Sequence, residues 1–184
     1  MKHSEIKDHI VKTASQLFYK NGYNLTGINE IIAEAGIAKA TLYNHFKSKE
    51  EVCLAYLQYK NDTFLNDIAE FCNAKRKGSG RVLGIFDFLK AFFKDSDFNG
   101  CWCIRTASEI PKDKATIRIE IQKQKENFIQ LIESFVEDNL EIDNTKAIAR
   151  QLYVLYEGAV AESYLHQQEW PITEARSIAS KIIV

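Results

Sequence analysis

The sequence predicts an all-α protein of about nine helices, and two observations support that fold class. Proline occurs only at Pro111 and Pro171, so few positions interrupt a helix. Apolar residues recur every three or four positions along most of the chain, and the period-two alternation typical of strands is not repeated. With 184 residues, the chain is long enough to bury a core in one or two domains.

The first predicted helix begins near Ser4 and ends at Asn21 and Gly22. Its apolar stripe has no core of its own and is expected to pack on the next two helices. Burying each large side chain contributes roughly 1.5–3 kcal/mol, which makes a compact three-helix domain feasible. The stripe consists of Ile6, Ile10, Val11, Ala14, Leu17 and Phe18.

A second, short helix is predicted between Thr26 and Gly36. The Thr26 hydroxyl is expected to cap it by accepting a free backbone N–H, and Gly36 ends it because glycine adopts the left-handed conformation at little cost. Another turn of helix follows, with Ile37, Leu42 and Phe46 predicted on its inner face. The outer face is predicted to carry Lys39, Ala40, Thr41, Tyr43, Asn44 and His45.

Two short helices joined by a glycine turn are typical of a helix-turn-helix, whose second helix enters the major groove of DNA. An ordinary helical hairpin gives the same pattern. The net charge of the chain is −1, but residues 1–50 carry 7 Lys and Arg against 5 Asp and Glu. The small positive excess therefore accompanies the motif, where contact with DNA phosphates would need it.

A long fourth helix is predicted to begin at Ser48, because Ser48 and Glu51 form a Ser-x-x-Glu capping box. The helix runs to about Cys72, and its apolar residues change face along the way. One helix is therefore expected to belong to two cores. We accordingly predict domains at residues 1–48 and 49–184, with a connecting helix over about 49–72.

The remaining helices are predicted from the same periodicity. A basic, glycine-rich loop over residues 74–81 precedes them, and Thr173 is expected to cap the last helix. The predicted ranges are 82–93, 113–139, 144–166 and 173–182.

The helix over 144–166 is apolar or small on almost every side between Leu152 and Ala161. One core cannot satisfy such a helix, so its outer side is expected to meet a second copy of the chain. Two helices from each subunit would then form a four-helix interface with two-fold symmetry. The predicted dimer-interface residues are Tyr153, Gly158, Ala159, Ala161, Ile178 and Ile182.

The four cysteines, Cys53, Cys72, Cys101 and Cys103, are expected to be reduced thiols in a soluble, cytoplasmic protein. No apolar run approaches the roughly 18 residues that span a bilayer. No metal site is predicted, because Cys101-Trp102-Cys103 lacks the spacing of a zinc site, and no cofactor is predicted. A reactive thiol at Cys101 remains an alternative, with Arg105 one helical turn away.

The run from Gly36 to Val52, GIAKATLYNHFKSKEEV, resembles the turn, the recognition helix and the start of the fourth helix in the TetR family of bacterial transcriptional regulators. The pattern Gly-Cys-x5-Ala-x-Glu from Gly100 to Glu109 is similar to the start of the sixth helix in one branch of that family. The resemblance implies an N-terminal three-helix helix-turn-helix DNA-binding domain and a C-terminal helical ligand-binding and dimerisation domain, in a homodimer.

The resemblance also implies roles for individual residues in binding double-stranded operator DNA. Lys39 and Thr41 would meet base edges, with Asn29 and Asn44 as secondary candidates. Two positions depart from the family pattern, since Gly27 and Ala38 replace a frequent Thr and a frequent Ser. The residues expected to hold phosphates are Thr26, Tyr43, His45 and Lys49.

We therefore predict a transcriptional regulator rather than an enzyme. It would be a repressor that leaves a pseudo-palindromic operator when a small aromatic or amphipathic ligand binds the C-terminal domain. The same aromatic residues would equally suit a simple core. The predicted ligand-binding residues are Phe64, Phe86, Leu89, Phe93, Trp102, Arg105, Glu109, Phe128, Tyr153, Tyr156 and Glu157.

Two alternatives remain from the sequence. One is a regulator that senses oxidants through Cys101 and Cys103. The other is a thiol-dependent helical enzyme, although no nucleophile and base stand at a diagnostic spacing.

Overall fold

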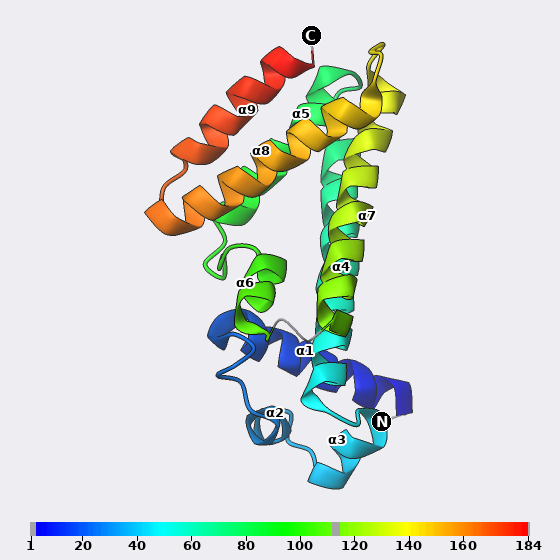
Figure 1. Ribbon diagram of the computed structural model, residues 1–184, viewed down its shortest axis with the longest axis vertical. Helices are drawn as coiled ribbons and strands as arrows, with labels where there is room; N and C mark the ends of the chain where they lie inside the picture. Colours follow the sequence, from blue (N-terminus) through cyan, green and yellow to red (C-terminus); the bar gives the residue numbers. More distant parts are fainter. Residues whose placement is uncertain (1–2, 112–114, 184) are drawn as a thin grey trace. The chain divides into compact units, whose positions relative to one another are not determined.

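The computed structural model describes residues 3–111 and 115–183, and within them the chain forms nine helices and no strand (Figure 1). The predicted all-α class is thus confirmed. The predicted start of the seventh helix at Asp113 lies outside the described residues. The helices are α1 (His3–Asn21), α2 (Ile28–Glu34), α3 (Lys39–His45), α4 (Lys49–Asn73), α5 (Ser79–Phe93), α6 (Trp102–Glu109), α7 (Ala115–Asn139), α8 (Thr145–His166) and α9 (Trp170–Ile182).

The chain divides into two compact units. Unit 1 contains the described residues up to Thr63 together with Trp102–Gln124, and unit 2 contains Phe64–Cys101 and the described residues from Lys125 onward. Helices α4 and α7 each contribute residues to both units, so the expectation that one long helix serves two cores is confirmed for α4. A functional boundary after residue 48 stays a prediction.

The core of unit 1 is built from the apolar stripe of α1 and the inner faces of α2, α3 and α4. Helix α1 ends as predicted, because Gly22 has a φ of +91° and its N–H donates to the carbonyl of Phe18 at 2.9 Å. A left-handed residue there turns the chain out of the helix. Large side chains buried in this core include Ile10, Phe18, Ile31, Leu42, Phe46 and Tyr56.

The start of α2 differs from the prediction, because Gly27 rather than Thr26 occupies the cap position. Thr26 is completely buried, and its hydroxyl lies 2.8 Å from the carbonyl of Gly22, to which it donates. The hydroxyl is therefore used inside the protein. The Glu30 carboxylate serves the helix start instead, accepting the N–H of Gly27 at 3.2 Å.

The end of α2 confirms the predicted glycine turn. Gly36 has a φ of +62°, and its N–H donates to the carbonyl of Ala33 at 3.1 Å. The N–H of Ile37 reaches back to the carbonyl of Ile32 at 3.2 Å. These two bonds define a Schellman motif, which satisfies carbonyls at the helix end and fixes the direction in which α3 departs.

Helix α4 begins directly after Ser48, as the capping box predicts. The Ser48 hydroxyl accepts the N–H of Glu51 at 3.2 Å. The Glu51 carboxylate accepts the N–H of Lys47 at 2.7 Å, one residue earlier than in the standard box. Two free backbone donors are thereby satisfied at the junction between α3 and α4.

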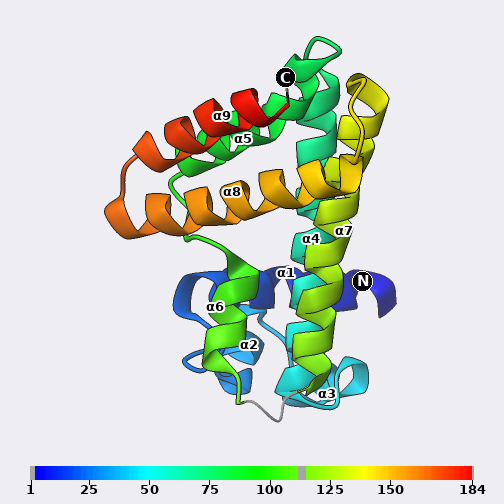
Figure 2. The same cartoon turned by 45° about the horizontal axis from the view of Figure 1, so that its top comes forward.

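In unit 2, helices α5, α8 and α9 pack on one another, and both views place them together (Figures 1 and 2). Helix α8 follows Asn144 and ends at His166, as predicted. The prediction that Thr173 caps α9 was wrong, because α9 begins at Trp170 with Pro171 in its first turn. Proline lacks the N–H that this turn would leave unpaired, so it favours a helix start.

Within the part of the chain that the structure describes, no helix combines the length and the apolar character needed to cross a membrane.

Candidate nucleic-acid interface

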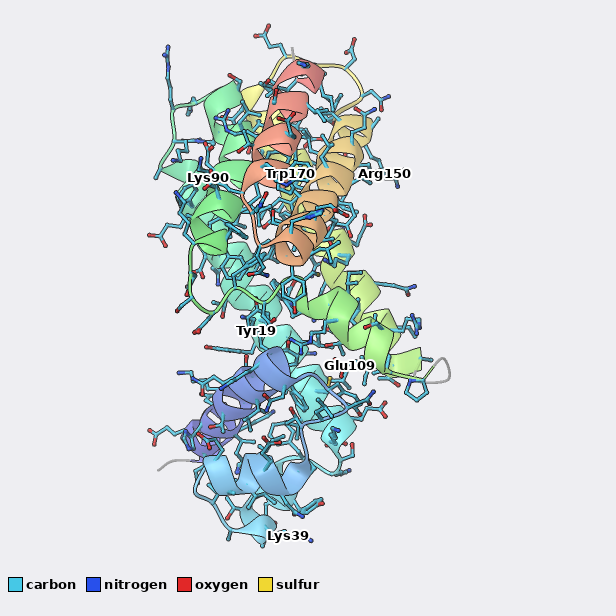
Figure 3. All side chains as sticks on the ribbon, turned by 90° about the vertical axis from the view of Figure 1, so that its left-hand side faces the viewer. Tyr19, Lys39, Lys90, Glu109, Arg150 and Trp170 are labelled. Atoms are coloured by element: carbon cyan, nitrogen blue, oxygen red, sulfur yellow. The ribbon has the colours of Figure 1, made fainter. Side chains whose placement is uncertain are left out.

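Helix α3 presents one buried and one exposed face. Leu42 is completely buried and Phe46 is 3 % exposed, so these two side chains anchor the helix in unit 1. Lys39 projects from α3 at the outer edge of the unit (Figure 3). Ala40, Asn44 and Tyr43 are also exposed, while Thr41 and His45 are half-buried. Four of the six residues predicted on the outer face of α3 are thus exposed, and the predicted inner residues Leu42 and Phe46 are buried.

Two of the residues predicted to contact DNA, Lys39 and Lys49, are lysines whose ammonium groups lie over aromatic rings. The Lys39 ammonium is 6.0 Å from the ring centroid of Tyr43, and the Lys49 ammonium is 4.4 Å from that of Tyr23. Burial lowers the pKa of Lys49, while Cys53 and Glu109 act in the opposite direction. Lys39 is thus the more exposed of the two cations, whereas Lys49 is partly withdrawn from water.

Thr26 and Asn29 occupy contrasting places among the residues predicted to contact DNA. The hydroxyl and the backbone N–H of Thr26 both donate to the carbonyl of Gly22, at 2.8 and 3.3 Å. Asn29 is exposed on α2. The structure therefore places Thr26 as a support of the loop before α2, and Asn29 on the surface of the first turn of α2.

Sequence reasoning missed a set of contacts that hold α6 to the rest of unit 1. The guanidinium of Arg105 donates to the carbonyls of Tyr19 at 2.9 Å and Lys20 at 3.3 Å. The Glu109 carboxylate accepts the N–H of Asn24 at 2.7 Å, and the Asn24 amide donates to the carbonyl of Glu109 at 2.9 Å. Helix α6 is thereby fastened to the end of α1 and to the loop that leads into α2.

The predicted ligand-binding residues fall into both units. Trp102, Arg105 and Glu109 belong to unit 1. In unit 2, the ring centroid of Phe128 lies 5.0 Å from that of Phe64 and 4.9 Å from that of Tyr156. The other predicted members in unit 2 are Phe86, Leu89, Phe93, Tyr153 and Glu157. The structure thus brings an aromatic cluster together in unit 2 and assigns three of the predicted residues elsewhere.

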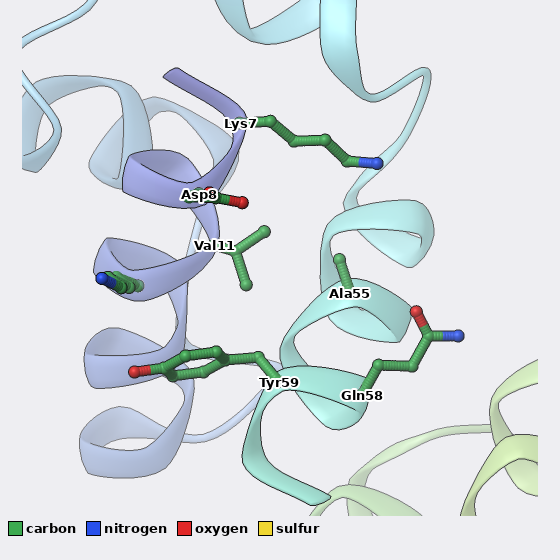
Figure 4. A pocket seen from close by; sticks show the side chains of 7 residues that line it. Lys7, Asp8, Val11, Ala55, Gln58 and Tyr59 are labelled. Carbon is green, nitrogen blue, oxygen red and sulfur yellow. The ribbon is translucent and has the colours of Figure 1, made fainter. Parts of the chain in front are cut away.

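A surface pocket of about 430 Å³ lies between α1 and α4 in unit 1 (Figure 4). The residues predicted to bind a ligand are not among those that line it. Its lining mixes charges of both signs with apolar groups, and consists of Lys7, Asp8, Val11, Lys12, Ala55, Gln58 and Tyr59.

The predicted dimer residues differ in exposure. Gly158, Ala161 and Ile178 are exposed, Tyr153 and Ile182 are half-buried, and Ala159 is already buried within its own unit. Two exposed apolar residues of α8 are not among the predicted dimer residues: Leu165 is 71 % exposed and Val154 is 66 % exposed. The sequence itself indicates this stripe, because its four residues are separated by four, three and four positions and such spacings lie along one side of a helix. This apolar stripe of α8 consists of Val154, Gly158, Ala161 and Leu165.

All four cysteines are free thiols. Burial raises the pKa of Cys53 and of Cys72 to about 12, so neither is a ready nucleophile. Among the described residues, no three His, Cys, Asp or Glu side chains are grouped so that they could hold a metal ion.

A short helix that follows a glycine turn, anchored by two buried side chains and presenting a polar outer face, defines a helix-turn-helix protein. Residues 10–56 match the model of the family described as bacterial regulatory proteins, tetR family. The regulator QacR of Staphylococcus aureus is 46 % identical over 148 aligned residues, which cover 58 % of this chain and 79 % of QacR. The chain therefore belongs to the TetR family of transcriptional regulators.

Other relatives extend the similarity over the whole chain. The transcriptional repressor NemR of Escherichia coli is 23 % identical over 195 aligned residues, covering 99 % of this chain and 96 % of NemR. The crystal structure of reduced E. coli NemR superposes with a TM-score of 0.87 at 20 % identity, covering 98 % of both chains. A TetR-family regulator from Streptomyces coelicolor gives a TM-score of 0.87 at 22 % identity, covering 100 % of this chain and 95 % of the other. The solved structures support the fold.

Proposed function

We propose that this regulator is a cytoplasmic, homodimeric repressor that binds a pseudo-palindromic operator through the outer face of α3. The observation that carries the proposal is the exposed Lys39 on a helix anchored by Leu42 and Phe46. A lysine in the major groove can donate to O6 and N7 of guanine, and the methyl group of Thr41 suits thymine. Repression is supported by the similarity to NemR, which is itself named a repressor.

The apolar stripe of α8 supports a dimer. Val154 and Leu165 expose apolar side chains, and Gly158 and Ala161 between them are small enough for a second helix to approach closely. A homodimer with two-fold symmetry carries two copies of α3, and successive major grooves on one face of DNA lie about 34–36 Å apart.

The aromatic cluster of unit 2 supports a small aromatic or amphipathic ligand. Phe64, Phe128 and Tyr156 come from α4, α7 and α8, so a planar molecule inserted among them would change how these helices pack. Helices α4 and α7 also contribute to unit 1. Coupling of about 1–3 kcal/mol between two such sites is typical and would suffice to release DNA.

Replacing Lys39 with alanine is expected to weaken binding to the operator by about 1–3 kcal/mol and to relax the preference at one base pair. The cause would be the loss of the hydrogen bonds that the lysine ammonium donates to O6 and N7 of one guanine. The measurement is a gel-shift titration on DNA that flanks the protein's own gene, with single base-pair substitutions in the shifted fragment.

Lys146→Ala provides the matched control, because Lys146 is an exposed lysine in the first turn of α8 in unit 2. It removes the same charge without touching α3, and operator affinity is expected to stay unchanged. An equal loss for Lys39→Ala on operator and on random DNA would assign Lys39 to the phosphate backbone and contradict base reading.

The ligand part of the proposal is tested on the same protein–operator complex. A compound that inserts into the aromatic cluster is expected to release the DNA in a dose-dependent manner, and Phe128→Leu, which removes the central ring, is expected to raise the concentration needed. Equal sensitivity of the wild type and of Phe128→Leu would place the ligand outside the cluster.

A further inference from the structure

The surface pocket between α1 and α4, which we call the α1–α4 pocket, combines the features of a small-molecule site. Its volume of about 430 Å³ lies within the range of about 300–1,000 Å³ that is usual for ligand pockets. Val11, which is 8 % exposed, and the half-buried Ala55 supply apolar surface from the two helices. The other lining residues are polar, and a few polar groups around an apolar centre are what orients a ligand.

Lys7 and Tyr59 reach across the α1–α4 pocket from opposite helices (Figure 4). The Lys7 side chain extends from α1 towards α4, and the Tyr59 ring extends from α4 towards α1. Val11 and Ala55 lie between them. A planar group can therefore pack on the Tyr59 ring and the apolar centre, while an anionic group attached to it meets the Lys7 ammonium.

The charges that line the α1–α4 pocket match a ligand with a single negative charge. Lys7 and Lys12 are exposed cations, and Asp8 is an exposed carboxylate on the same helix. The lining therefore carries one positive charge in excess. One carboxylate neutralises that excess, whereas a second carboxylate on the ligand would be repelled by Asp8.

We propose that the α1–α4 pocket binds a small aromatic monocarboxylate, and that the bound anion weakens the binding of unit 1 to DNA. The pocket shares no residue with the aromatic cluster of unit 2, so it is a second and separate ligand site.

The effect on DNA follows from how little positive charge this part of the chain carries. Residues 1–50 contain 7 Lys and Arg against 5 Asp and Glu, and Lys7 and Lys12 are two of those seven. One anion held by these lysines cancels half of the positive excess. Attraction to DNA phosphates depends on that charge, so the affinity for DNA falls when the pocket is filled.

Lys7 also connects the α1–α4 pocket to α3. Its ammonium lies 5.7 Å from the ring centroid of Phe46, the residue that follows α3 and is 3 % exposed. A carboxylate competes with this ring for the ammonium, because charge-assisted hydrogen bonds are stronger than cation–π contacts at exposed sites. The backbone amide of Phe46 is therefore expected to respond when the pocket is filled.

The site is tested by adding indole-3-propionate to the ¹⁵N-labelled full-length protein and following its amide NMR signals. Signals around Val11 and Ala55, and that of Phe46, are expected to shift with one dissociation constant on the order of 0.1–1 mM, as suits a small ligand in an open pocket. Indole-3-propanamide, which lacks the charge, is expected to bind about fivefold more weakly. Hexanoate, which lacks the ring, is expected to bind about fivefold more weakly or worse.

Two pairs of variants assign the binding to the α1–α4 pocket. Ala55→Leu fills the pocket and is expected to weaken binding about tenfold or more, whereas Ala55→Ser keeps the side chain small and is expected to stay within about twofold of the wild type. Lys7→Met is expected to weaken binding about fivefold. Lys123→Met, which removes an exposed lysine of unit 1 outside the pocket, is expected to bind like the wild type.

Shifts confined to unit 2, or unchanged binding by a folded Ala55→Leu protein, would overturn the proposed site. Equal affinity for indole-3-propionate and its amide would overturn the proposed charge of the ligand, and equal affinity for hexanoate would overturn its aromatic class.

The effect on DNA rests on the proposed operator binding and has its own readout. Saturating indole-3-propionate is expected to raise the dissociation constant for the operator about twofold or more at about 50 mM salt, and by less at about 200 mM, because salt screens the added charge. Phe128→Leu is expected to respond like the wild type, and Ala55→Leu is expected not to respond.

Unchanged or tighter operator binding by the filled wild-type protein would refute the effect on DNA, while the NMR titration would still decide the site. Absence of any operator binding without ligand would instead refute the proposed function.

Discussion

Replacing Gly22 with alanine is expected to lower the free energy of unfolding by about 3 kcal/mol. The residue has a φ of +91°, and a side chain in the left-handed region costs roughly 1–2 kcal/mol. The added Cβ would also lie 2.3 Å from a carboxylate oxygen of Glu109. The carboxylate would have to leave the N–H of Asn24, and a hydrogen bond to a charged group contributes about 1.5–3 kcal/mol. Urea denaturation of the purified protein measures the loss.

Gly27→Ala is the matched control in the same unit. Gly27 has a φ of −90°, and a Cβ there would meet no atom of the described residues within 4 Å. Its effect is expected to be about 1 kcal/mol or less, because alanine at a helix cap is less favourable than glycine by roughly 0.5–1 kcal/mol and no clash or left-handed backbone adds to that cost.

A double-mutant cycle separates the two causes of the Gly22→Ala loss. If the clash with Glu109 contributes, Gly22→Ala combined with Glu109→Ala will cost less than the sum of the single losses. Full additivity would contradict the clash and leave only the backbone conformation as the cause.

The Glu157→Gln protein is expected to gain stability relative to the wild type as the pH rises. Burial raises the pKa of Glu157 in the folded state to about 7, above its value of about 4.5 in the unfolded chain. The folded protein therefore binds the proton more tightly, so this group's stabilisation is complete below pH 4.5 and is lost as the pH rises through 7. The wild type should lose roughly 2–3 kcal/mol from this group between pH 5 and 8. The glutamine side chain does not ionise, so the Glu157→Gln protein does not lose this stability.

The measurement is the difference in free energy of unfolding between the two proteins at pH 5, 6.5 and 8. Glu174→Gln, which makes the same substitution at an exposed position of α9, is the matched control. A difference that changes with the opposite sign would mean that the ion pair with Lys125 outweighs burial and keeps the carboxylate charged.

Local sequence patterns were sufficient for most of the fold. Gly36 and Ile37 specify the turn after α2 because glycine and the hydrogen bonds of a Schellman motif act within six residues. Ser48 likewise identified the start of α4. The errors at Thr26 and Thr173 share one cause, since a threonine near a helix start has several backbone partners within reach. Which partner it takes depends on packing that the local pattern does not contain.

The candidate sites were predictable to different degrees. The outer face of α3 follows from periodicity within eight residues, so Lys39 could be assigned from the sequence. The partner of Cys101 could not be assigned. The sequence suggested Arg105 because it lies one helical turn away, yet the Arg105 guanidinium donates to the carbonyls of Tyr19 and Lys20. Lys125 takes that place, 24 positions along the chain, and no periodicity connects two helices across such a distance.

If the chain dimerises through the apolar stripe of α8, as we propose, the number of copies in the cell affects the stability of this regulator. Apolar surface left in water costs about 25 cal/mol per Å², and the proposed dimer would remove this cost by burying the stripe of one chain against that of the other. Dilution favours dissociation of the proposed dimer. The melting temperature of the regulator would therefore depend on its concentration in the cell. In a cell that contains few copies, the proposed dimer would have to persist through slow dissociation of its subunits rather than through frequent association.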